Sequence, residues 1–248
     1  MRGLQPGVIA VSGGIDSRFL WAAACRFELD FQPVFLVGPH MTASETEWAK
    51  GVLGRAGHVL TVDPLAHPAV RQTQISRCFH CKYESFAKLR AWGLAHGRPW
   101  VLEGSQESDG QAFRPGRRAL RFLGIKSPLA DVGLSKTEVR EIARDWALDW
   151  PDQPSRPCLL TRFAYETVVT CSALRRVEAI EDRLFRIGLR YFRVRVVPEA
   201  PWILQITAEE TEVFEHNRTA IADVFAAHGN SPWRLERTAT LSGYFDQP

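Results

Sequence analysis

The chain has 248 residues, enough for one large domain or for a domain with a smaller companion. Its 31 basic and 28 acidic residues leave a net charge of +3, which is too weak to indicate a nucleic-acid partner. It contains no apolar run of transmembrane length, and the first expected strand begins too close to Met1 for a signal peptide. We therefore expect a cytoplasmic protein whose five cysteines are reduced and serve as ligands or nucleophiles rather than as disulfides.

The first half of the chain alternates apolar runs typical of buried strands with amphipathic stretches typical of helices. The expected strands span residues 8–11, 33–37, 58–62 and 100–102. The expected helices span residues 17–27, 44–56 and 82–96, and a further helix begins at 135. Two of these helices open with a capping-box pattern, Ser44 with Glu47 and Ser135 with Glu138. The alternation predicts an α/β fold, a parallel sheet with helices on both faces, whose ligands bind at the carboxyl ends of the strands.

The pattern changes near residue 165, where we place the boundary between an α/β domain (residues 1–165) and a small α+β domain (residues 166–248). Ahead of this boundary, prolines at 151, 154 and 157 predict a rigid irregular loop over residues 150–163. The elements expected beyond it are a helix at 172–187, strands at 191–197 and 202–206, a helix at 207–227 and a short strand at 240–243. Thr207 and Glu210 form the capping-box pattern that would open the last helix.

Two glycines separate the first strand from the first helix, in the stretch Ser12–Ser17. Gly13 and Gly14 let the backbone approach a ligand closely, and the free N–H groups of the helix's first turn form an anion site. The hydroxyls of Ser12 and Ser17 can add donors, and Asp16 can hold a metal or a helix N-terminus. The order Ser-Gly-Gly-Ile-Asp-Ser resembles the pyrophosphate-binding loop of the PP-loop ATP pyrophosphatases. Members of that superfamily cleave ATP between its α- and β-phosphates and transfer AMP to a carboxylate or carbonyl oxygen.

Three of the five cysteines form a second pattern. Cys78 and Cys81 make a CxxC, which by itself fits a redox pair, half of a zinc site or two ligands of an iron–sulfur cluster. Cys158 follows in the proline-rich loop. Three cysteines that bind three irons of a cubane cluster leave the fourth iron open for an extra sulfide, as a sulfur carrier requires. We expect Cys25 to be a small core residue and Cys171 to be structural.

Taken in order, six stretches of the chain resemble the LarE-type sacrificial sulfur transferases, a branch of the PP-loop superfamily that builds the nickel-pincer cofactor of lactate racemase. The stretches are residues 12–17, 77–82, 113–119, 127–129, 157–162 and 193–195. The resemblance implies that ATP adenylylates a carboxylate of a pyridinium-3,5-dicarboxylate mononucleotide. A sulfur at the Cys158 position then attacks the acyl-adenylate, expels AMP and leaves a thiocarboxylate. Family members with a lone cysteine here give up its own sulfur and retain dehydroalanine, whereas three cysteines imply a 4Fe–4S cluster.

The resemblance also implies roles for individual residues. Cys78, Cys81 and Cys158 would hold the cluster. ATP and Mg²⁺ would be bound by Ser12, Gly13, Gly14, Asp16, Ser17, Gly104 and Asp109. The catalytic set would be Cys158, Lys82, Arg162, Glu181, Arg193 and Arg195. The chemistry agrees, because guanidinium forks bind phosphate and carboxylate groups bidentately and Lys82 stands beside the cysteines. Arg193 and Arg195 alternate with apolar residues on one strand, although a solvated strand face gives the same pattern.

Two stretches depart from the family pattern. Residues 103–109 read Glu-Gly-Ser-Gln-Glu-Ser-Asp, where the family more usually has Gly-Thr-Asn with Asp-Asp, so only Asp109 matches. Arg18 stands where a small residue commonly follows the glycine loop. These changes affect the identity of the carboxylate acceptor more than the class of reaction.

Three other functions remain open from the sequence. A PP-loop tRNA thiolase shares the chemistry, but the near-neutral charge and the absence of an added RNA-binding module argue against it. A nitrogen-transferring PP-loop enzyme does not explain Cys158, and a non-catalytic nucleotide or iron–sulfur module does not explain Asp16 and the arginines. The expected partner is a small nucleotide, with no membrane and no nucleic acid. The family also implies a homo-oligomer, for which Trp202, Trp233 and Phe245 are candidate interface residues.

Overall fold

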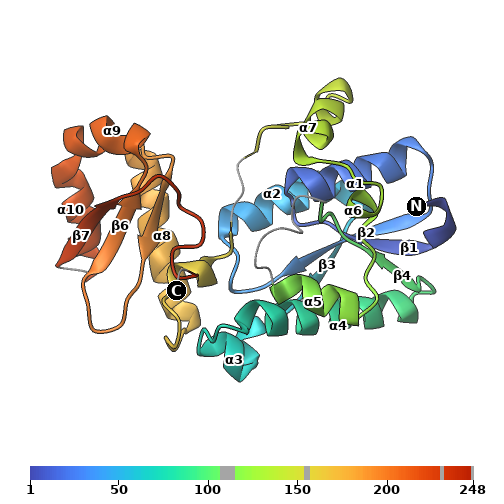
Figure 1. Ribbon diagram of the computed structural model, residues 1–248, viewed down its shortest axis with the longest axis horizontal. Coiled ribbons are helices and arrows are strands. Elements are labelled where there is room, and N and C mark those ends of the chain that lie inside the picture. The colour runs from blue at the N-terminus through green and yellow to red at the C-terminus, as the bar shows by residue number, and fades with distance from the viewer. Residues whose placement is uncertain (107–114, 154–156, 230–231, 247–248) are drawn as a thin grey trace. The chain divides into compact units, whose positions relative to one another are not determined.

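The computed structural model describes residues 1–106, 115–153, 157–229 and 232–246 (Figure 1). The chain divides into two compact units, and each is described by itself. Unit 1 comprises residues 1–70 and 76–156, and unit 2 comprises residues 71–75 and 157–248. The division therefore lies earlier in the chain than residue 165, because Phe163 forms a β-bridge with Val196 and the Val196 N–H bonds the Arg162 carbonyl at 2.7 Å.

Unit 1 is built on a four-stranded sheet in the order β3-β2-β1-β4, and all three strand pairs are parallel. The strands are β1 (Gly7–Ala10), β2 (Phe31–Val37), β3 (His58–Thr61) and β4 (Trp100–Leu102). In the central strand, Ile9 is in register with Pro33 of β2 and Leu102 of β4. The predicted α/β fold with a parallel sheet is confirmed, and each strand begins and ends within two residues of its expected limits.

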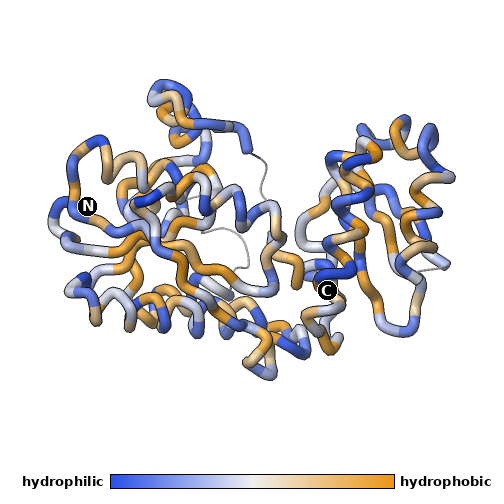
Figure 2. Tube along the Cα trace, turned by 180° about the vertical axis from the view of Figure 1, so that it is seen from behind, coloured by the Kyte–Doolittle hydropathy of each residue, from blue (hydrophilic) through white to orange (hydrophobic). Residues whose placement is uncertain are grey.

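Helices cover both faces of this sheet because successive residues of β1 point to opposite sides. Ile9 packs in a cluster with Phe19 and other residues of α1 (Ile15–Arg26), α2 (Ala43–Leu53), α6 (Pro128–Asp131) and α7 (Lys136–Asp145). Val8 packs in a second cluster with Leu89 and other residues of α4 (Arg77–Ala95) and α5 (Pro115–Phe122). Figure 2 shows the apolar strands of unit 1 between these helices. The remaining short elements are η1 (Arg2–Leu4), η2 (Gly54–Ala56), η3 (Pro64–Ala66) and α3 (Pro68–Arg71).

Two helix starts in unit 1 differ from the sequence prediction. The capping box of α2 is formed by Thr42 and Glu45 and not by Ser44 and Glu47, because the Glu45 N–H bonds the Thr42 hydroxyl and the Thr42 N–H bonds the Glu45 carboxylate, both at 3.1 Å. Helix α4 begins at Arg77 instead of residue 82, without a side-chain cap from Ser76. The CxxC therefore lies on a helix. The capping box of α7 at Ser135 and Glu138 is confirmed.

The exposed side of α2 offers a simple stability test at Gly51. A Cβ added there meets no atom within 4 Å, and glycine inside a helix costs about 0.5–1 kcal/mol relative to alanine. Gly51→Ala is therefore expected to raise the free energy of unfolding by that amount in urea denaturation. Gly54→Ala at the end of the same helix is the control and is expected to destabilise the protein, because Gly54 has a φ of +53°. Loss of stability in Gly51→Ala would contradict this account of α2.

In the part of unit 2 that the structure describes, a three-stranded sheet in the order β5-β6-β7 is accompanied by the α-helices α8, α9 and α10. Its elements are η5 (Leu159–Arg162), α8 (Cys171–Ile187), β5 (Phe192–Arg195), β6 (Trp202–Ile206), η6 (Ala208–Glu210), α9 (Thr211–His216), α10 (Arg218–Ala227) and β7 (Trp233–Arg237). Strand β6 runs antiparallel to β5 and parallel to β7. Apolar residues such as Val194, Leu204 and Phe225 form its buried core.

Three expectations for unit 2 are wrong. The strand at 240–243 does not form, and β7 occupies the sheet edge instead. The expected helix at 207–227 is divided into η6, α9 and α10, with Asn217 between the last two at φ −110° and ψ 17°. Thr207 and Glu210 form no capping box, because the Glu210 carboxylate accepts the Tyr191 N–H at 2.8 Å. In addition, the loop expected at residues 150–163 is not irregular throughout, because residues 159–162 form the 3₁₀ turn η5.

The segment 71–75 joins unit 2 through Thr73, which is fully buried and has a φ of +47°. Its hydroxyl oxygen lies 2.7 Å from the Ala164 carbonyl oxygen and 2.9 Å from the Thr167 carbonyl oxygen, and it accepts the Thr167 N–H at 2.8 Å. The Val169 N–H also bonds the Arg71 carbonyl at 2.7 Å. These hydrogen bonds offset the strain of a β-branched residue at positive φ.

Across the ranges that the structure describes, no helix combines the length and the apolar character needed to cross a membrane.

Candidate functional site

The stretch Ser12–Ser17 forms a tight loop at the carboxyl end of β1, as predicted. The Ser17 hydroxyl is buried and organises the loop from inside, since it accepts the Ser12 N–H at 3.1 Å and donates to the Gly14 carbonyl at 2.9 Å. The Ser12 side chain is exposed and its oxygen lies 3.2 Å from that of Ser17. Gly13 has a φ of +82°, which favours glycine. With α1 beginning at Ile15, the backbone N–H groups of its first turn have no acceptor within the helix and, with the Ser12 hydroxyl, can bind an anion.

The loop after β4 packs directly on the glycine loop. A Cβ added to Gly104 would lie 2.9 Å from the Ser17 nitrogen and 3.0 Å from the Asp16 carbonyl carbon, so only glycine fits without a backbone shift. The Gln106 amide donates to the Asp16 carboxylate. Sequence reasoning did not single out Gln106, although it lies in the stretch that departs from the family pattern. Asp109, the predicted metal ligand in that stretch, lies outside the described residues.

The CxxC pair lies in the first turns of α4, where a spacing of three puts Cys78 and Cys81 on one helix face. Cys78 is exposed and Cys81 is half-buried. Lys82 follows on the same helix, with its ammonium 5.8 Å from the centre of the Phe86 ring and its stem against Gly116 of α5. A thiol pair on one face is compatible with two ligands of an iron–sulfur cluster.

The other cysteines belong to separate places in the chain. Cys158 is half-buried and forms the N-cap of η5 in unit 2. The expectation that Cys25 is a core residue is wrong: Cys25 is exposed, because it lies away from the face of α1 that carries the buried Ala24. Cys171 is exposed as well. Within the described ranges, no group of three or more His, Cys, Asp or Glu side chains is arranged to hold a metal ion.

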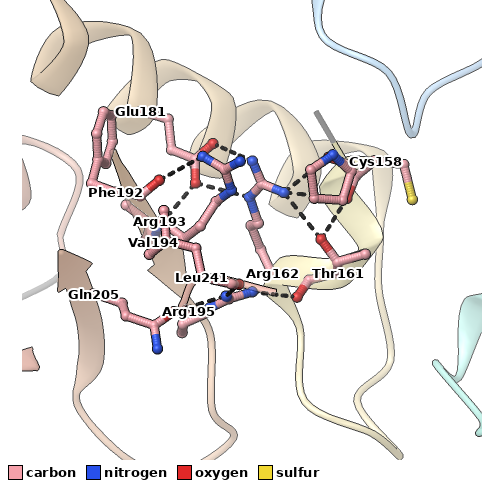
Figure 3. A network of polar contacts seen from close by, with 11 residues as sticks. Cys158, Thr161, Arg162, Glu181, Phe192, Arg193, Val194, Arg195, Gln205 and Leu241 are labelled. Carbon is pink, nitrogen blue, oxygen red and sulfur yellow. Dashed lines mark hydrogen bonds and ion pairs between the residues drawn. The ribbon is translucent and has the colours of Figure 1, made fainter. Parts of the chain in front are cut away.

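An ion pair in unit 2 fixes the turn that carries Cys158 (Figure 3). Arg162 is 5 % exposed and donates through Nε and Nη2 to the two carboxylate oxygens of Glu181, both at 2.9 Å. Its Nη1 donates to the Pro157 carbonyl at 3.0 Å and to the Thr161 hydroxyl at 3.0 Å, and it lies 3.5 Å from the Cys158 carbonyl oxygen. The fork therefore joins helix α8 to the backbone on both sides of the Cys158 peptide.

Arg193 and Arg195 come from β5, as predicted, but they differ in burial. Arg193 is half-buried and donates to the Phe192 carbonyl at 2.7 Å. Arg195 is 3 % exposed, donates to Gln205 Oε1 at 3.0 and 2.8 Å, and donates to the Thr161 carbonyl at 2.9 Å and to the Leu241 carbonyl. Its guanidinium also lies 5.0 Å from the Tyr244 ring. Arg195 is thus surrounded by partners from its own unit.

The charges of this cluster shift its pKa values. Burial acts to raise the pKa of Glu181, but the charge and hydrogen bonds of Arg162, the charge of Arg193 and the Val194 N–H together hold it below its ordinary value. Burial, together with the like charges of Arg162 and Arg193, lowers the pKa of Arg195 to about 10. Three arginines around one carboxylate leave the cluster with net positive charge, which suits an anionic ligand.

Comparisons with known proteins give relatives but no family model, since none matches the chain. The chain is 34 % identical over 198 residues to the uncharacterised protein slr1717 of Synechocystis, a match that covers 77 % of this chain and 73 % of the relative. It is 27 % identical over 190 residues to the uncharacterised protein MJ0830 of Methanocaldococcus jannaschii, covering 76 % and 73 %.

A third relative has a named activity. The chain is 26 % identical over 200 residues to the pyridinium-3,5-bisthiocarboxylic acid mononucleotide synthase of Lactiplantibacillus plantarum, covering 79 % of this chain and 72 % of that enzyme. The chain therefore belongs to the family of the Synechocystis protein slr1717, and the Lactiplantibacillus synthase, a LarE protein, is its distant homologue.

Proposed function

We propose that this protein is an ATP-dependent sulfur transferase that adenylylates a carboxylate of a pyridinium-3,5-dicarboxylate mononucleotide and converts it to a thiocarboxylate. The observation that carries the proposal is the glycine loop after β1, with Gly104 of the loop after the neighbouring strand β4 packed against it. The distant homology to a synthase of this class supports the choice of substrate.

In the first step, a carboxylate oxygen of the substrate attacks the α-phosphorus of ATP and pyrophosphate leaves. The backbone N–H groups of Gly13, Gly14 and Ile15 and the Ser12 hydroxyl would bind the departing pyrophosphate. Asp16 would contribute a carboxylate to Mg²⁺, with Gln106 orienting it through the amide hydrogen bond. Lys82 would neutralise the α-phosphate or the substrate carboxylate.

In the second step, a sulfur nucleophile attacks the acyl carbon, AMP departs, and a thiocarboxylate remains. We assign Arg162 and Glu181 the role of holding the Cys158 turn. Glu181 fixes the Arg162 guanidinium, which donates a hydrogen bond to the Pro157 carbonyl next to Cys158. Arg193 would bind the substrate's phosphate or second carboxylate, and the buried Arg195 would position the Thr161 backbone. A 4Fe–4S cluster on Cys78, Cys81 and Cys158 would supply a dispensable sulfide from its open iron.

The test uses anaerobically purified and reconstituted protein. Wild type is expected to contain about four irons and to absorb near roughly 400 nm, and Cys158→Ala is expected to lose both while it retains ATP–pyrophosphate exchange with the substrate. Cys171→Ala is the matched control, because Cys171 is a second cysteine of unit 2 and lies outside the proposed cluster. If wild type contains no iron and Cys158 loses the mass of one hydrogen sulfide after turnover, the sulfur comes from Cys158 itself and not from a cluster. If substrate-dependent pyrophosphate release is absent, the proposal is wrong, and co-purifying tRNA would favour a thiolase.

A further inference from the structure

Arg18, the residue after the glycine loop, is buried at 4 % exposure in the first turns of α1. Its own backbone N–H bonds the Gly14 carbonyl at 3.0 Å, so its main chain is part of the loop's framework. Its side chain points to another part of unit 1. Nη2 donates to the Trp150 carbonyl and to Gln153 Oε1, both at 3.1 Å, and Nη1 donates to the Asp149 carbonyl.

Trp48 of α2 connects the same arginine to the glycine loop a second time. Its indole Nε1 donates to the Gly13 carbonyl at 3.2 Å. The Arg18 guanidinium lies 5.6 Å from the centre of the Trp48 ring, within the range of a cation–π interaction. Trp150 meets Trp48 edge to face, with 6.1 Å between ring centres.

The segment Asp149–Gln153 is held in a conformation that would not persist alone. Trp150 has a φ of +46°, which is strained for a residue with a large side chain. Helix α7 adds two further arginines, since Arg144 pairs with Asp152 at 2.6 Å and Arg140 lies 3.5 Å from the Gln153 carbonyl oxygen. Arg18 also bonds the glycine loop, through its backbone N–H and the Gly14 carbonyl. In the sequence, the segment ends five residues before Cys158.

We propose that Arg18 is a positioning residue that couples nucleotide binding at the glycine loop to the order of the segment Asp149–Gln153, which leads to Cys158. The inference rests on the proposed function, because it takes the glycine loop as the nucleotide site. A ligand that fixes the Gly13 and Gly14 peptides restricts both Trp48 and the start of α1. Arg18 belongs to the start of α1, and its guanidinium lies against the Trp48 ring. The planar fork reaches acceptors on three residues, which the point charge of a lysine cannot reproduce.

The experiment measures hydrogen exchange of the backbone amides from Asp149 to Gln153 with and without a Mg²⁺-bound ATP analogue that has a methylene bridge between its α- and β-phosphates. In wild type the analogue is expected to slow this exchange about tenfold, and Arg18→Lys is expected to remove that protection. Coupling between two sites is reciprocal, so the analogue should also bind Arg18→Lys more weakly, by up to the same factor of about ten.

Arg144→Gln is the matched control, because it removes a contact to the same segment without touching the glycine loop. It is expected to speed exchange by the same factor with and without the analogue. The protection ratio, which is the exchange rate without the analogue divided by the rate with it, should therefore stay as in wild type. Trp48→Phe, which keeps a ring beneath Arg18 but loses the hydrogen bond to Gly13, provides a second variant with a reduced ratio. Binding of the analogue without protection of this segment, or full protection in Arg18→Lys, would overturn the coupling alone. If wild type does not bind the analogue, the proposed function fails together with the coupling.

Discussion

Glu181→Gln is expected to lower the free energy of unfolding by about 3–5 kcal/mol, the usual effect of removing one partner from a buried ion pair. The side chains of Arg162 and Glu181 are 6 % and 14 % exposed, and the carboxylate receives two hydrogen bonds from Arg162 and one from the Val194 N–H. Without its charge, the Glu181 carboxylate no longer offsets the repulsion among Arg162, Arg193 and Arg195. Urea denaturation of both proteins measures the difference.

The exposed ion pair between Glu47 and Lys50, with side chains 74 % and 46 % exposed, supplies the control. Glu47→Gln should change the free energy of unfolding by no more than about 1 kcal/mol, because solvent screens such pairs. Equal effects of the two substitutions would show that the buried cluster does not stabilise unit 2.

The loss in Glu181→Gln also depends on pH. Because the pKa of Glu181 is lower in the folded protein than its ordinary value of 4.5, the carboxylate contributes stability that is fully present above pH 4.5. That contribution is lost as the pH falls through the folded-state pKa. The difference between wild type and Glu181→Gln should therefore be constant near neutral pH and shrink below pH 4.5. A difference that grows on acidification would mean that the pKa is raised instead.

Gly104→Ala is expected to weaken binding of an ATP analogue at least tenfold and to reduce turnover about 100-fold, the effect of displacing a reacting group by about 1 Å. The added Cβ would stand 2.9 Å from the Ser17 nitrogen and 3.2 Å from the Asp16 carbonyl oxygen, so the glycine loop must move. Calorimetric titration of the analogue measures the affinity.

Gly3→Ala is the control for Gly104→Ala, because a Cβ at Gly3 meets nothing within 4 Å. It should bind the analogue as wild type does. Unchanged affinity in Gly104→Ala would show that the loop after β4 does not contribute to nucleotide binding.

Much of unit 1 could be predicted because its strands are short apolar runs rich in Val and Ile, which favour buried parallel strands. The start of α2 could not be settled in this way. Both Thr42 with Glu45 and Ser44 with Glu47 satisfy the capping-box spacing, and only the hydrogen bonds of the folded chain select the first pair. Strand β7 was missed because its arginines and glutamate are typical of an exposed edge.

The arginines show why the candidate site was only partly predictable. Sequence patterns place arginine at the surface, where it is most often found. Arg18, Arg162 and Arg195 are each no more than 5 % exposed, and backbone carbonyls and the side chains of Gln153, Glu181 and Gln205 accept hydrogen bonds from their guanidinium groups. The side-chain acceptors lie 10 or more residues away in the sequence and leave no local signal. The predicted roles of these residues toward a substrate stay predictions.

The attachment of Thr73 to unit 2 has a consequence for how the protein is made. During synthesis, residues 71–75 leave the ribosome long before Ala164 and Thr167, to which Thr73 bonds, so unit 2 cannot be completed when that segment emerges. While unit 1 folds, this segment waits without its partners from unit 2. Thr73 and Ala164 are about 90 residues apart in the sequence, and the entropic cost of closing such a loop grows only slowly with its length. A fragment that starts at Pro157 would therefore lack a buried piece of its own unit.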